Sequence, residues 1–316
     1  MRAKWLGCAA LLWAAGASAA AVLPEAFVEL RAKDARVARI GYELVTGNAA
    51  FCDQQTPATG LLLHDLAAYG DGEKLGRLLG MTSPVGIQAV VPGSPADQSG
   101  LAADQSIASL AGLDVAGMPT DEKKRWKRLE TIRVAMVEQL QTERKLAFQA
   151  VGGESLVIEA IPACASRFEV GPLGKRAVAD GSRVVIGEDF PGHEWSDELL
   201  AGVMAHELAH NVLRHRAWLD AKGRKRKNVR LTEREADRLA PWLLANAGYD
   251  PEAAVRFMAT WGPDHSGGIF RKRTHDGWDE RVEFIAAEVP LVRAQMAATG
   301  TADWRSNFRR EIKPQG

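Results

Sequence analysis

The sequence has no surplus of charge of either sign, because its 40 Lys and Arg residues are balanced by 40 Asp and Glu residues. This balance points neither to nucleic acid nor to an acidic substrate as a partner. Internal repeats, low-complexity tracts and long linkers are absent as well. With 316 residues, of which 46% are hydrophobic and 25% charged, the chain has ordinary globular composition and enough length for two compact domains.

The apolar run at the N-terminus is short and rich in alanine, whereas a membrane span needs about 20 apolar residues. Arg2 and Lys4 begin the chain, residues 5–15 are apolar, and Ala17-Ser18-Ala19 offers the small residues that a signal peptidase reads. We therefore expect residues 1–19 to be a cleavable signal peptide. The mature chain would be periplasmic or secreted and would have no transmembrane domain. The alternative is a chain that stays anchored to the membrane through its N-terminus.

Cysteine is scarce, and only three are present. Cys8 would leave with the signal peptide, so Cys52 and Cys164 would remain. Two cysteines in an oxidising compartment favour a disulfide, which would close a loop of 164 − 52 = 112 residues. Two buried free thiols are the alternative.

The spacing of apolar residues changes along the chain. Residues 23–49 have helical spacing and predict one amphipathic helix. From about residue 56 to residue 162 the pattern is that of a separate unit with short strands. Its expected elements are a strand at 85–91, a short helix capped by Ser94 and ended by Gly100, a strand at 107–110, a charged helix at 121–144 that includes Trp126 in its apolar stripe, and a hairpin of 145–150 with 156–161.

This unit resembles a bacterial PDZ domain. The resemblance rests on Val90-Val91-Pro92-Gly93-Ser94-Pro95-Ala96 and on Gly100-Leu101, although Asp104-Gln105 stands where the family has Gly-Asp. It implies binding of a peptide C-terminus or an extended strand at a sheet edge. By that resemblance, Leu79-Gly80-Met81 would be the loop that binds the peptide carboxylate. A small structural module without a ligand is the alternative.

The segment His206-Glu207-Leu208-Ala209-His210 has the spacing of a zinc site on a helix that Ser196 can cap. His206 and His210 are four residues apart and therefore lie on one helical face, within about 40° of each other. Glu207 lies beside them and is placed to act as a general base. With seven His in the chain, this spacing can also arise by chance, and the histidines would then only satisfy core hydrogen bonds.

A catalytic zinc takes three protein ligands, so a third is needed. His215 is nine residues from His206 and therefore points to the opposite face of the helix, which excludes it as the third ligand. The best supplier is the segment 233–237, which Thr232 can cap: Glu233 would be the ligand and Asp237, one turn on, would orient a ligating imidazole. Glu235 points the other way and is interpreted as solvated. An exposed acidic turn is the alternative.

The two segments together resemble the gluzincin peptidases of the HtpX and CAAX-prenyl-protease family. Ala247-Gly248-Tyr249-Asp250-Pro251 fits the turn after the ligand helix, and Thr274-His275-Asp276 with Arg281-Val282 resembles the family's Thr-His-Pro…Arg-Ile element, with Asp276 in place of the proline. The resemblance covers about residues 166–290. It implies a zinc endopeptidase in which His275 faces the site as a catalytic residue that contacts either the metal or the tetrahedral intermediate, and in which Arg281 fixes nearby structure. A surface helix cap is the alternative for both. Residues 183–186 would be the edge strand on which substrate pairs.

These interpretations predict an α+β fold, in which a mainly helical gluzincin domain with a small edge sheet carries an inserted β-rich PDZ-like domain. The expected boundaries are 1–19 for the signal peptide, 20–55 for an N-terminal helix that packs on the catalytic domain, 56–163 for the PDZ-like domain and 164–316 for the metallopeptidase domain. The basic run at 222–227 is interpreted as a solvated hairpin, with contact to anionic lipid or an acidic substrate as the alternative.

The predicted function is cleavage of unfolded or misassembled proteins by an exported endopeptidase that holds one Zn²⁺ per chain, without nucleic acid as a partner. The first alternative is a zinc-stabilised PDZ chaperone or scaffold that holds exported polypeptides without cutting them. The second is hydrolysis of a non-peptide amide, for example in cell-wall material.

Overall fold

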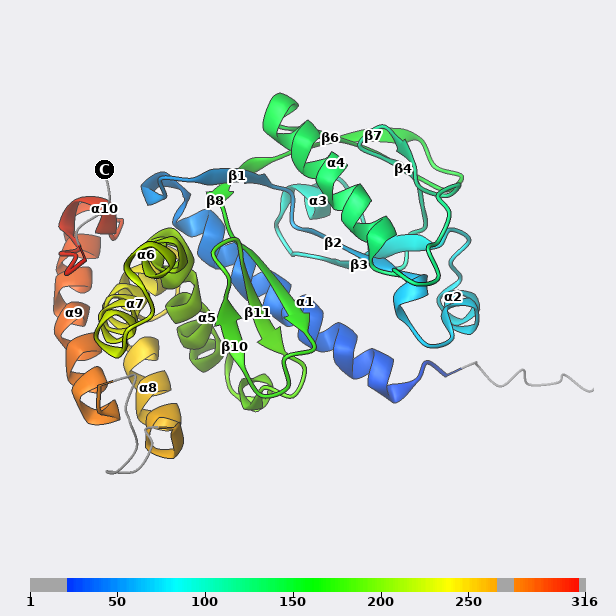
Figure 1. Cartoon of the computed structure of the whole chain (residues 1–316). Helices are drawn as coiled ribbons and strands as arrows, with labels where there is room; N and C mark the ends of the chain where they lie inside the picture. The colour runs from blue at the N-terminus through cyan, green and yellow to red at the C-terminus, as the bar shows by residue number, and fades with distance from the viewer. Residues whose placement is uncertain (1–21, 266–275, 313–316) are drawn as a thin grey trace, which may run out of the picture.

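The computed structural model describes residues 22–265 and 276–312. The predicted signal peptide and His275 lie outside the described residues. The fold is α+β: the helices of residues 197–307 lie on one side of the molecule, and the small sheets lie beside them together with a long helix of residues 127–143 (Figure 1). No helix in the described residues is long and apolar enough to cross a membrane.

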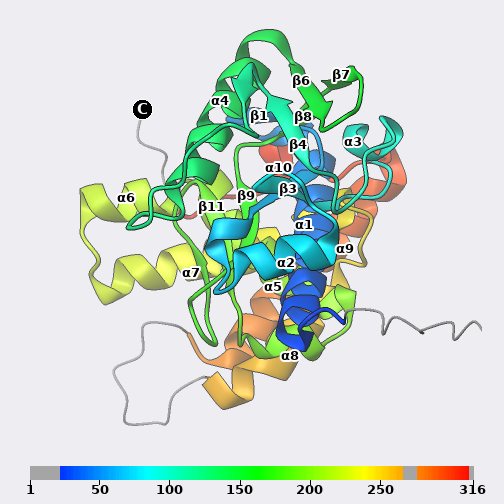
Figure 2. The same cartoon turned by 90° about the vertical axis from the view of Figure 1, so that its right-hand side faces the viewer.

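Helix α1 is the element on which the rest is assembled. It spans Glu25–Gly47, and its residues Val37, Ile40 and Leu44 are fully buried at the spacing that the sequence predicts for an amphipathic helix. In Figures 1 and 2 it passes under the sheets and beside the helical half of the molecule. Its polar face also contacts the unit of residues 56–163, because Arg31 pairs at 3.0 Å with Asp104, in the turn before residue 107.

Residues 61–160 enclose a hydrophobic core of their own, which includes Ile87, Ile107, Ile132 and Phe148. Strands β2 and β3 pair antiparallel, and a four-stranded sheet has the order β5-β4-β6-β7. The elements are β2 (Leu61–Asp65), α2 (Gly72–Leu79), β3 (Val85–Val90), α3 (Pro95–Gln98), β4 (Ile107–Leu110), β5 (Leu113–Asp114), α4 (Lys127–Glu143), β6 (Lys145–Ala150) and β7 (Ser155–Glu159), with a 3₁₀ turn at Leu66–Ala68.

Most of the local expectations for this unit are confirmed. Ser94 accepts a hydrogen bond from the backbone of Asp97 at the start of α3, and Gly100 has a φ of +75° after it. β6 and β7 form the expected hairpin. The charged helix, however, begins at Lys127 instead of residue 121, because the Asp121 side chain accepts the backbone N–H groups of Lys123 and Lys124 and holds a turn there. Trp126 consequently lies before the helix and is 65% exposed.

The geometry of Leu79-Gly80-Met81 does not fit a carboxylate-binding loop. Leu79 ends α2, and Gly80 is its left-handed cap. The N–H of Gly80 is bonded to the carbonyl of Arg77, and the N–H of Met81 to that of Gly76. As in a Schellman-type cap, both N–H groups are hydrogen-bonded to carbonyls in the last turn of α2. They are therefore not directed at a ligand. The resemblance to a PDZ loop in the sequence therefore reflects a helix C-terminus.

Two short strands connect this unit to the rest of the chain. β1 (Gln55–Ala58) and β8 (Ile161–Cys164) pair antiparallel, with Gln55 opposite Cys164. Beside them, Cys52 and Cys164 form the expected disulfide, with a Cα–Cα distance of 5.4 Å. The disulfide therefore joins the two ends of the segment 53–163, at the place where this segment connects to the rest of the protein.

A three-stranded sheet follows, with the order β10-β11-β9. β9 (Arg167–Gly171) is parallel to β11 (Arg183–Gly187), and β10 (Ala177–Ala179) is antiparallel to it. The expectation that residues 183–186 form the edge strand is wrong, since β11 has a neighbour on each side. The two edge strands of this sheet are β9, which packs against α1, and β10, which packs next to α5.

The remaining elements are helical and surround a large core that α1 shares. They are α5 (Asp197–Val212), α6 (His215–Lys222), α7 (Arg226–Asn246), α8 (Glu252–His265), α9 (Trp278–Thr299) and α10 (Trp304–Asn307), with 3₁₀ turns at Ala49–Phe51 and Pro191–Glu194. Ser196 caps α5 as expected, through its contact with the backbone N–H of Leu199. The basic residues 222–227 are exposed and join α6 to α7.

Candidate metal centre

Helices α5 and α7 bring three donor side chains together. The Nε2 atom of His206 lies 3.5 Å from the carboxylate of Glu233, and the Nε2 atom of His210 lies 3.6 Å from it. The two Nε2 atoms are 3.3 Å apart. One ligand atom from each residue fits within a span of 4.8 Å, and this is the one such cluster of His, Cys, Asp or Glu side chains in residues 22–265 and 276–312. The three residues could therefore hold a metal ion.

The start of the third ligand's helix differs from the expectation. Thr232 does not cap a helix, because α7 begins six residues earlier, at Arg226. Thr232 is fully buried inside α7, and its hydroxyl donates to the carbonyl of Val229. Glu233 and Asp237 nevertheless lie on the face of α7 that meets α5, as their spacing of four predicts.

Asp237 and Arg281 support the first histidine. The Nδ1 atom of His206 is 3.0 Å from Oδ1 of Asp237, close enough to interact although the angle departs from that of a good hydrogen bond. Arg281, on α9, donates to both oxygens of Asp237 at 2.6 and 2.8 Å and lies 4.0 Å from Glu233. The roles expected for Asp237 and Arg281 are therefore compatible with their positions. A carboxylate on the outer nitrogen of a ligating imidazole fixes its orientation.

The geometry assumed for His215 is wrong. Helix α5 ends at Val212, and Arg214 adopts a left-handed conformation with a φ of +58° that turns the chain back. As a result, the Nδ1 atom of His215 lies 3.0 Å from the Nδ1 atom of His210. Glu235 is also misassigned, because it is fully buried and bonded to His215 Nε2 at 3.1 Å instead of being solvated.

Burial lowers the pKa of both candidate histidine ligands and the nearby carboxylates raise it, but the balance differs between the two. Burial disfavours the charged form of His206, but the carboxylates of Asp237 and Glu233 outweigh it and raise the pKa of His206 to about 10. For His210, burial dominates and lowers the pKa to about 4. The site thus attracts positive charge through two carboxylates while keeping one imidazole neutral and able to donate a lone pair.

Glu207 is half-buried on the cleft side of α5. Burial has the largest effect on its carboxyl group and raises the pKa above the ordinary value, and the nearby Glu233 raises it further. The backbone N–H of Ala179, on β10, opposes this shift by hydrogen bonding to the carboxylate. A carboxylate with a raised pKa is a better proton acceptor than an exposed one.

The cluster opens into a cleft of about 420 Å³, bordered by strand β10 and by α5, α6 and α7. The backbone N–H of Asp180, just after β10, donates to the carbonyl of Arg183 on β11. The N–H of Gly187, on β11, donates to the carbonyl of Arg176, just before β10. Every second residue along β10 therefore hydrogen-bonds to β11. Ala177 and Ala179 are the alternate residues, and their backbone groups point away from β11 towards the cleft, where the N–H of Ala179 is bonded to Glu207. An extended chain could pair with this edge.

Asn211 is a further residue that the sequence reading does not identify. It is buried next to His210, and its side chain accepts from the N–H of Gly181 at 2.7 Å and donates to the carbonyl of Arg183 at 3.0 Å. These bonds fasten the β10–β11 turn to the end of α5. They therefore fix the position of the free strand edge relative to the candidate ligands.

The last expected elements are partly described. Asp250 accepts from the backbone of Glu252 at the start of α8, as expected for a cap. Asp276, which replaces a proline in the resembled motif, pairs with Arg230 at 3.2 Å and with Arg234 at 2.8 Å. It thereby ties the chain before α9 to α7. His275 lies outside the described residues, so its expected role stays a prediction.

Comparison with known proteins does not add a family assignment. No protein-family model matches the chain. No curated protein matches it either.

Proposed function

We propose that the chain is an exported zinc-dependent endopeptidase of the gluzincin type. The observation that carries this proposal is the convergence of His206, His210 and Glu233 beside the half-buried carboxylate of Glu207. Two imidazole nitrogens and one carboxylate are a common ligand set of catalytic zinc, and they leave a position for water. A soft metal would favour sulfur, and Ca²⁺ or Mg²⁺ would favour oxygen alone.

His206, His210 and Glu233 would hold the ion. Its chemistry would be to lower the pKa of water, so that a nucleophile is available near neutral pH, and to polarise the scissile carbonyl. Glu207 takes a proton from the attacking water and then delivers it to the leaving amine. Arg281 and Asp237 keep His206 in place during these steps. The edge of β10 holds the substrate backbone as an added strand, which brings its carbonyl next to Glu207.

The other parts of the proposal follow from the same features. The substrate is an extended polypeptide, because a strand edge recognises backbone and not a folded surface. The disulfide between Cys52 and Cys164 supports export to an oxidising compartment. Residues 56–163, whose strands and helices enclose a core of their own, would be the PDZ-like unit of this protein.

The test compares the wild type with Glu207→Gln on an unfolded protein and on cell-wall fragments, with and without a chelator. Wild-type cleavage of protein should stop on chelation and return with Zn²⁺. Glu207→Gln should keep its zinc, measured by elemental analysis, and lose cleavage by about 10²-fold or more. Cleavage retained by this variant contradicts the role of Glu207. Zinc binding without any cleavage by the wild type indicates a chaperone or scaffold, and cleavage of wall fragments alone indicates another amide substrate.

A further inference from the structure

On the Nδ1 side of the His210 ring, three further side chains follow one another through hydrogen bonds, and the first of them, His215, also borders the cleft. His210 Nδ1 lies 3.0 Å from His215 Nδ1, and His215 Nε2 lies 3.1 Å from Glu235 Oε2. Arg310 donates to the same oxygen of Glu235 at 2.8 Å, and the backbone N–H of Ile312 donates to its other oxygen at 2.7 Å. His215 is 1% exposed and Glu235 is 0% exposed. We call these residues, His215, Glu235 and Arg310, the His210 support chain.

The hydrogen bonds in the support chain determine where each proton lies. Glu235 accepts from Arg310 and Ile312, so it is a carboxylate, and His215 must present an Nε2–H to it. A neutral His215 then has a lone pair on Nδ1, which accepts a hydrogen bond from Nδ1–H of His210. His210 is left with its lone pair on Nε2, which is the atom in the donor cluster. The chain therefore selects the tautomer that can bind a metal.

The two candidate histidine ligands are supported differently. His206 has a carboxylate, Asp237, directly at its Nδ1 atom. His210 has a neutral imidazole there, and the carboxylate is one residue further away. The left-handed turn at Arg214 makes this arrangement possible, because it ends α5 and places His215 at the start of α6, beside the last turn of α5. A straight helix could not bring His215 to this position.

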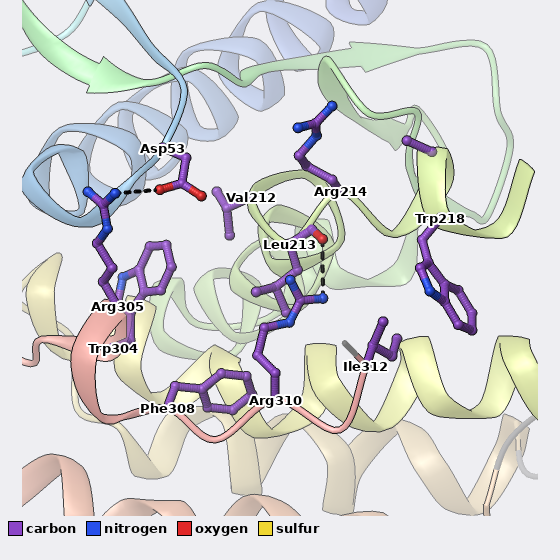
Figure 3. Close-up of a pocket in the computed structure, with 11 residues that line it drawn as sticks. Asp53, Val212, Leu213, Arg214, Trp218, Trp304, Arg305, Phe308, Arg310 and Ile312 are labelled. Carbon is purple, nitrogen blue, oxygen red and sulfur yellow. Dashed lines mark hydrogen bonds and ion pairs between the residues drawn. The ribbon is translucent and has the colours of Figure 1, made fainter. Parts of the chain in front are cut away.

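The outer end of the support chain reaches a second cavity. This cavity has a volume of about 550 Å³ and shares no lining residue with the metal cleft. Figure 3 shows the Arg310 side chain between Leu213 and Phe308, with its guanidinium directed at the carbonyl of Leu213. Arg305 lies in the same cavity, where it pairs with Asp53 at 2.9 Å. A small cation from solvent could therefore reach the place of the Arg310 guanidinium.

We propose that His215, Glu235 and Arg310 are positioning residues that fix the tautomer and ring orientation of His210 for metal binding. This inference rests on the proposed metal site. Residues of this kind act through a ligand, and their loss typically lowers metal affinity 10- to 100-fold. Arg310 is the outermost member and touches neither the metal cleft nor its lining. Its loss should still lower the metal affinity, because the effect passes through Glu235 and His215.

The first experiment measures Zn²⁺ affinity by competition with a chelator for His215→Phe, His215→Gln and the control His64→Phe. His64 is a second buried imidazole, in β2 and 3% exposed, and it has no contact with the donor cluster. His215→Phe should weaken Zn²⁺ binding about 10- to 100-fold. His215→Gln retains an acceptor and a donor and should recover part of the affinity, whereas His64→Phe should leave it unchanged. Equal affinity in wild type and His215→Phe overturns the inference.

The second experiment uses Arg310→Ala and added guanidinium ion at low millimolar concentration. The variant should bind Zn²⁺ more weakly, and guanidinium should restore the affinity by entering from the second cavity and pairing with Glu235. The matched control is Arg305→Ala, which removes a guanidinium from the same cavity without touching the support chain. It should keep wild-type affinity and show no response to guanidinium. Absence of rescue in folded Arg310→Ala, checked by circular dichroism, contradicts the role of Arg310.

The absorption spectrum of the Co²⁺-substituted protein gives a readout that does not depend on cleavage. Changes in the orientation of His210 should shift its d–d bands in His215→Phe and in Arg310→Ala, and guanidinium should reverse the shift in the second variant only. If the wild type itself binds neither Zn²⁺ nor Co²⁺, the proposed function fails. If the wild type binds and the variants bind equally well with unchanged spectra, only the inference on the support chain fails.

Discussion

Arg281, on α9, holds Asp237, on α7, through two hydrogen bonds of 2.6 and 2.8 Å. Asp237 is 1% exposed, and it lies next to His206. A buried carboxylate without a partner would be costly, so the guanidinium both stabilises Asp237 and determines its orientation. This pair therefore connects a residue outside the cleft to the metal affinity expected of the site.

We predict that Arg281→Lys lowers Zn²⁺ affinity about 10- to 100-fold, because lysine keeps the charge but cannot make both bonds in one plane. Chelator competition measures the effect, and circular dichroism checks that the variant is folded. Arg293→Lys, on the same helix, is the control because Arg293 is exposed and pairs with Asp250. A normal zinc affinity in Arg281→Lys would show that Asp237 needs no support from α9.

The disulfide leads to a prediction on stability. It closes a loop of 112 residues, and the chain-entropy model gives such a cross-link about 4–5 kcal/mol. Since measured values are often smaller, we expect the double variant Cys52→Ser and Cys164→Ser to lose about 2–5 kcal/mol in its free energy of unfolding. Denaturant unfolding of both proteins measures this loss. A reducing agent should destabilise the wild type and leave the double variant unchanged; an equal response of the two would contradict the assignment.

The free edge of β10 leads to a prediction on substrate binding. Ala177→Pro removes an N–H that points to the cleft and leaves the pairs between β10 and β11 in place. We expect kcat/KM for an extended peptide to fall about 10-fold, or about 1.4 kcal/mol, which corresponds to the loss of one hydrogen bond. Zinc affinity should not change. The control is Val178→Thr, which keeps all backbone groups of the strand; a similar loss in that variant would indicate an effect of shape and not of backbone pairing.

The sequence predicts the parts of the site that depend on spacing within one helix. His206 and His210 are four residues apart on α5, and Glu233 and Asp237 are four apart on α7, so each pair shares a face once the helix forms. Ser196, Ser94 and Gly100 are local signals of the same kind, and the structure uses each of them as expected. The resemblance to gluzincins adds Arg281, whose contact with Asp237 joins residues 44 positions apart.

The errors have a different origin, because they concern where a helix ends and what covers it. Arg214 takes the left-handed conformation without a glycine to indicate it, and the position of His215 depends on that turn. Glu235 is on the outer face of α7 as the helical spacing requires, but Arg310 from the C-terminal segment covers that face. Such long-range coverage leaves no local pattern in the sequence. The misassigned loop at Gly80 shows the reverse case, in which a helix cap resembles a ligand loop.

A last prediction concerns Asp34, which lies where α1 meets β3 and β9. Burial is the main influence on its carboxyl group and raises the pKa to about 6, although Gln88 and the N–H of Val170 oppose the shift by hydrogen bonding. The ordinary value is 3.8, so the folded protein binds more protons than the unfolded chain between about pH 4 and pH 6. Stability must therefore fall as pH rises through this window, and the whole penalty remains at neutral pH.

Asp34→Asn removes this penalty and keeps an acceptor for the Gln88 amide. We expect the variant to be more stable than the wild type by about 1–3 kcal/mol at pH 7.5 and to differ little from it near pH 4, given 1.36 kcal/mol for each pKa unit. Urea unfolding at both pH values measures the difference. Glu154→Gln, at an exposed position, should show no such dependence on pH. A gain that is equal at both pH values would mean that the introduced amide acts through packing, because a titrating carboxylate must lose its effect once it is protonated in both states.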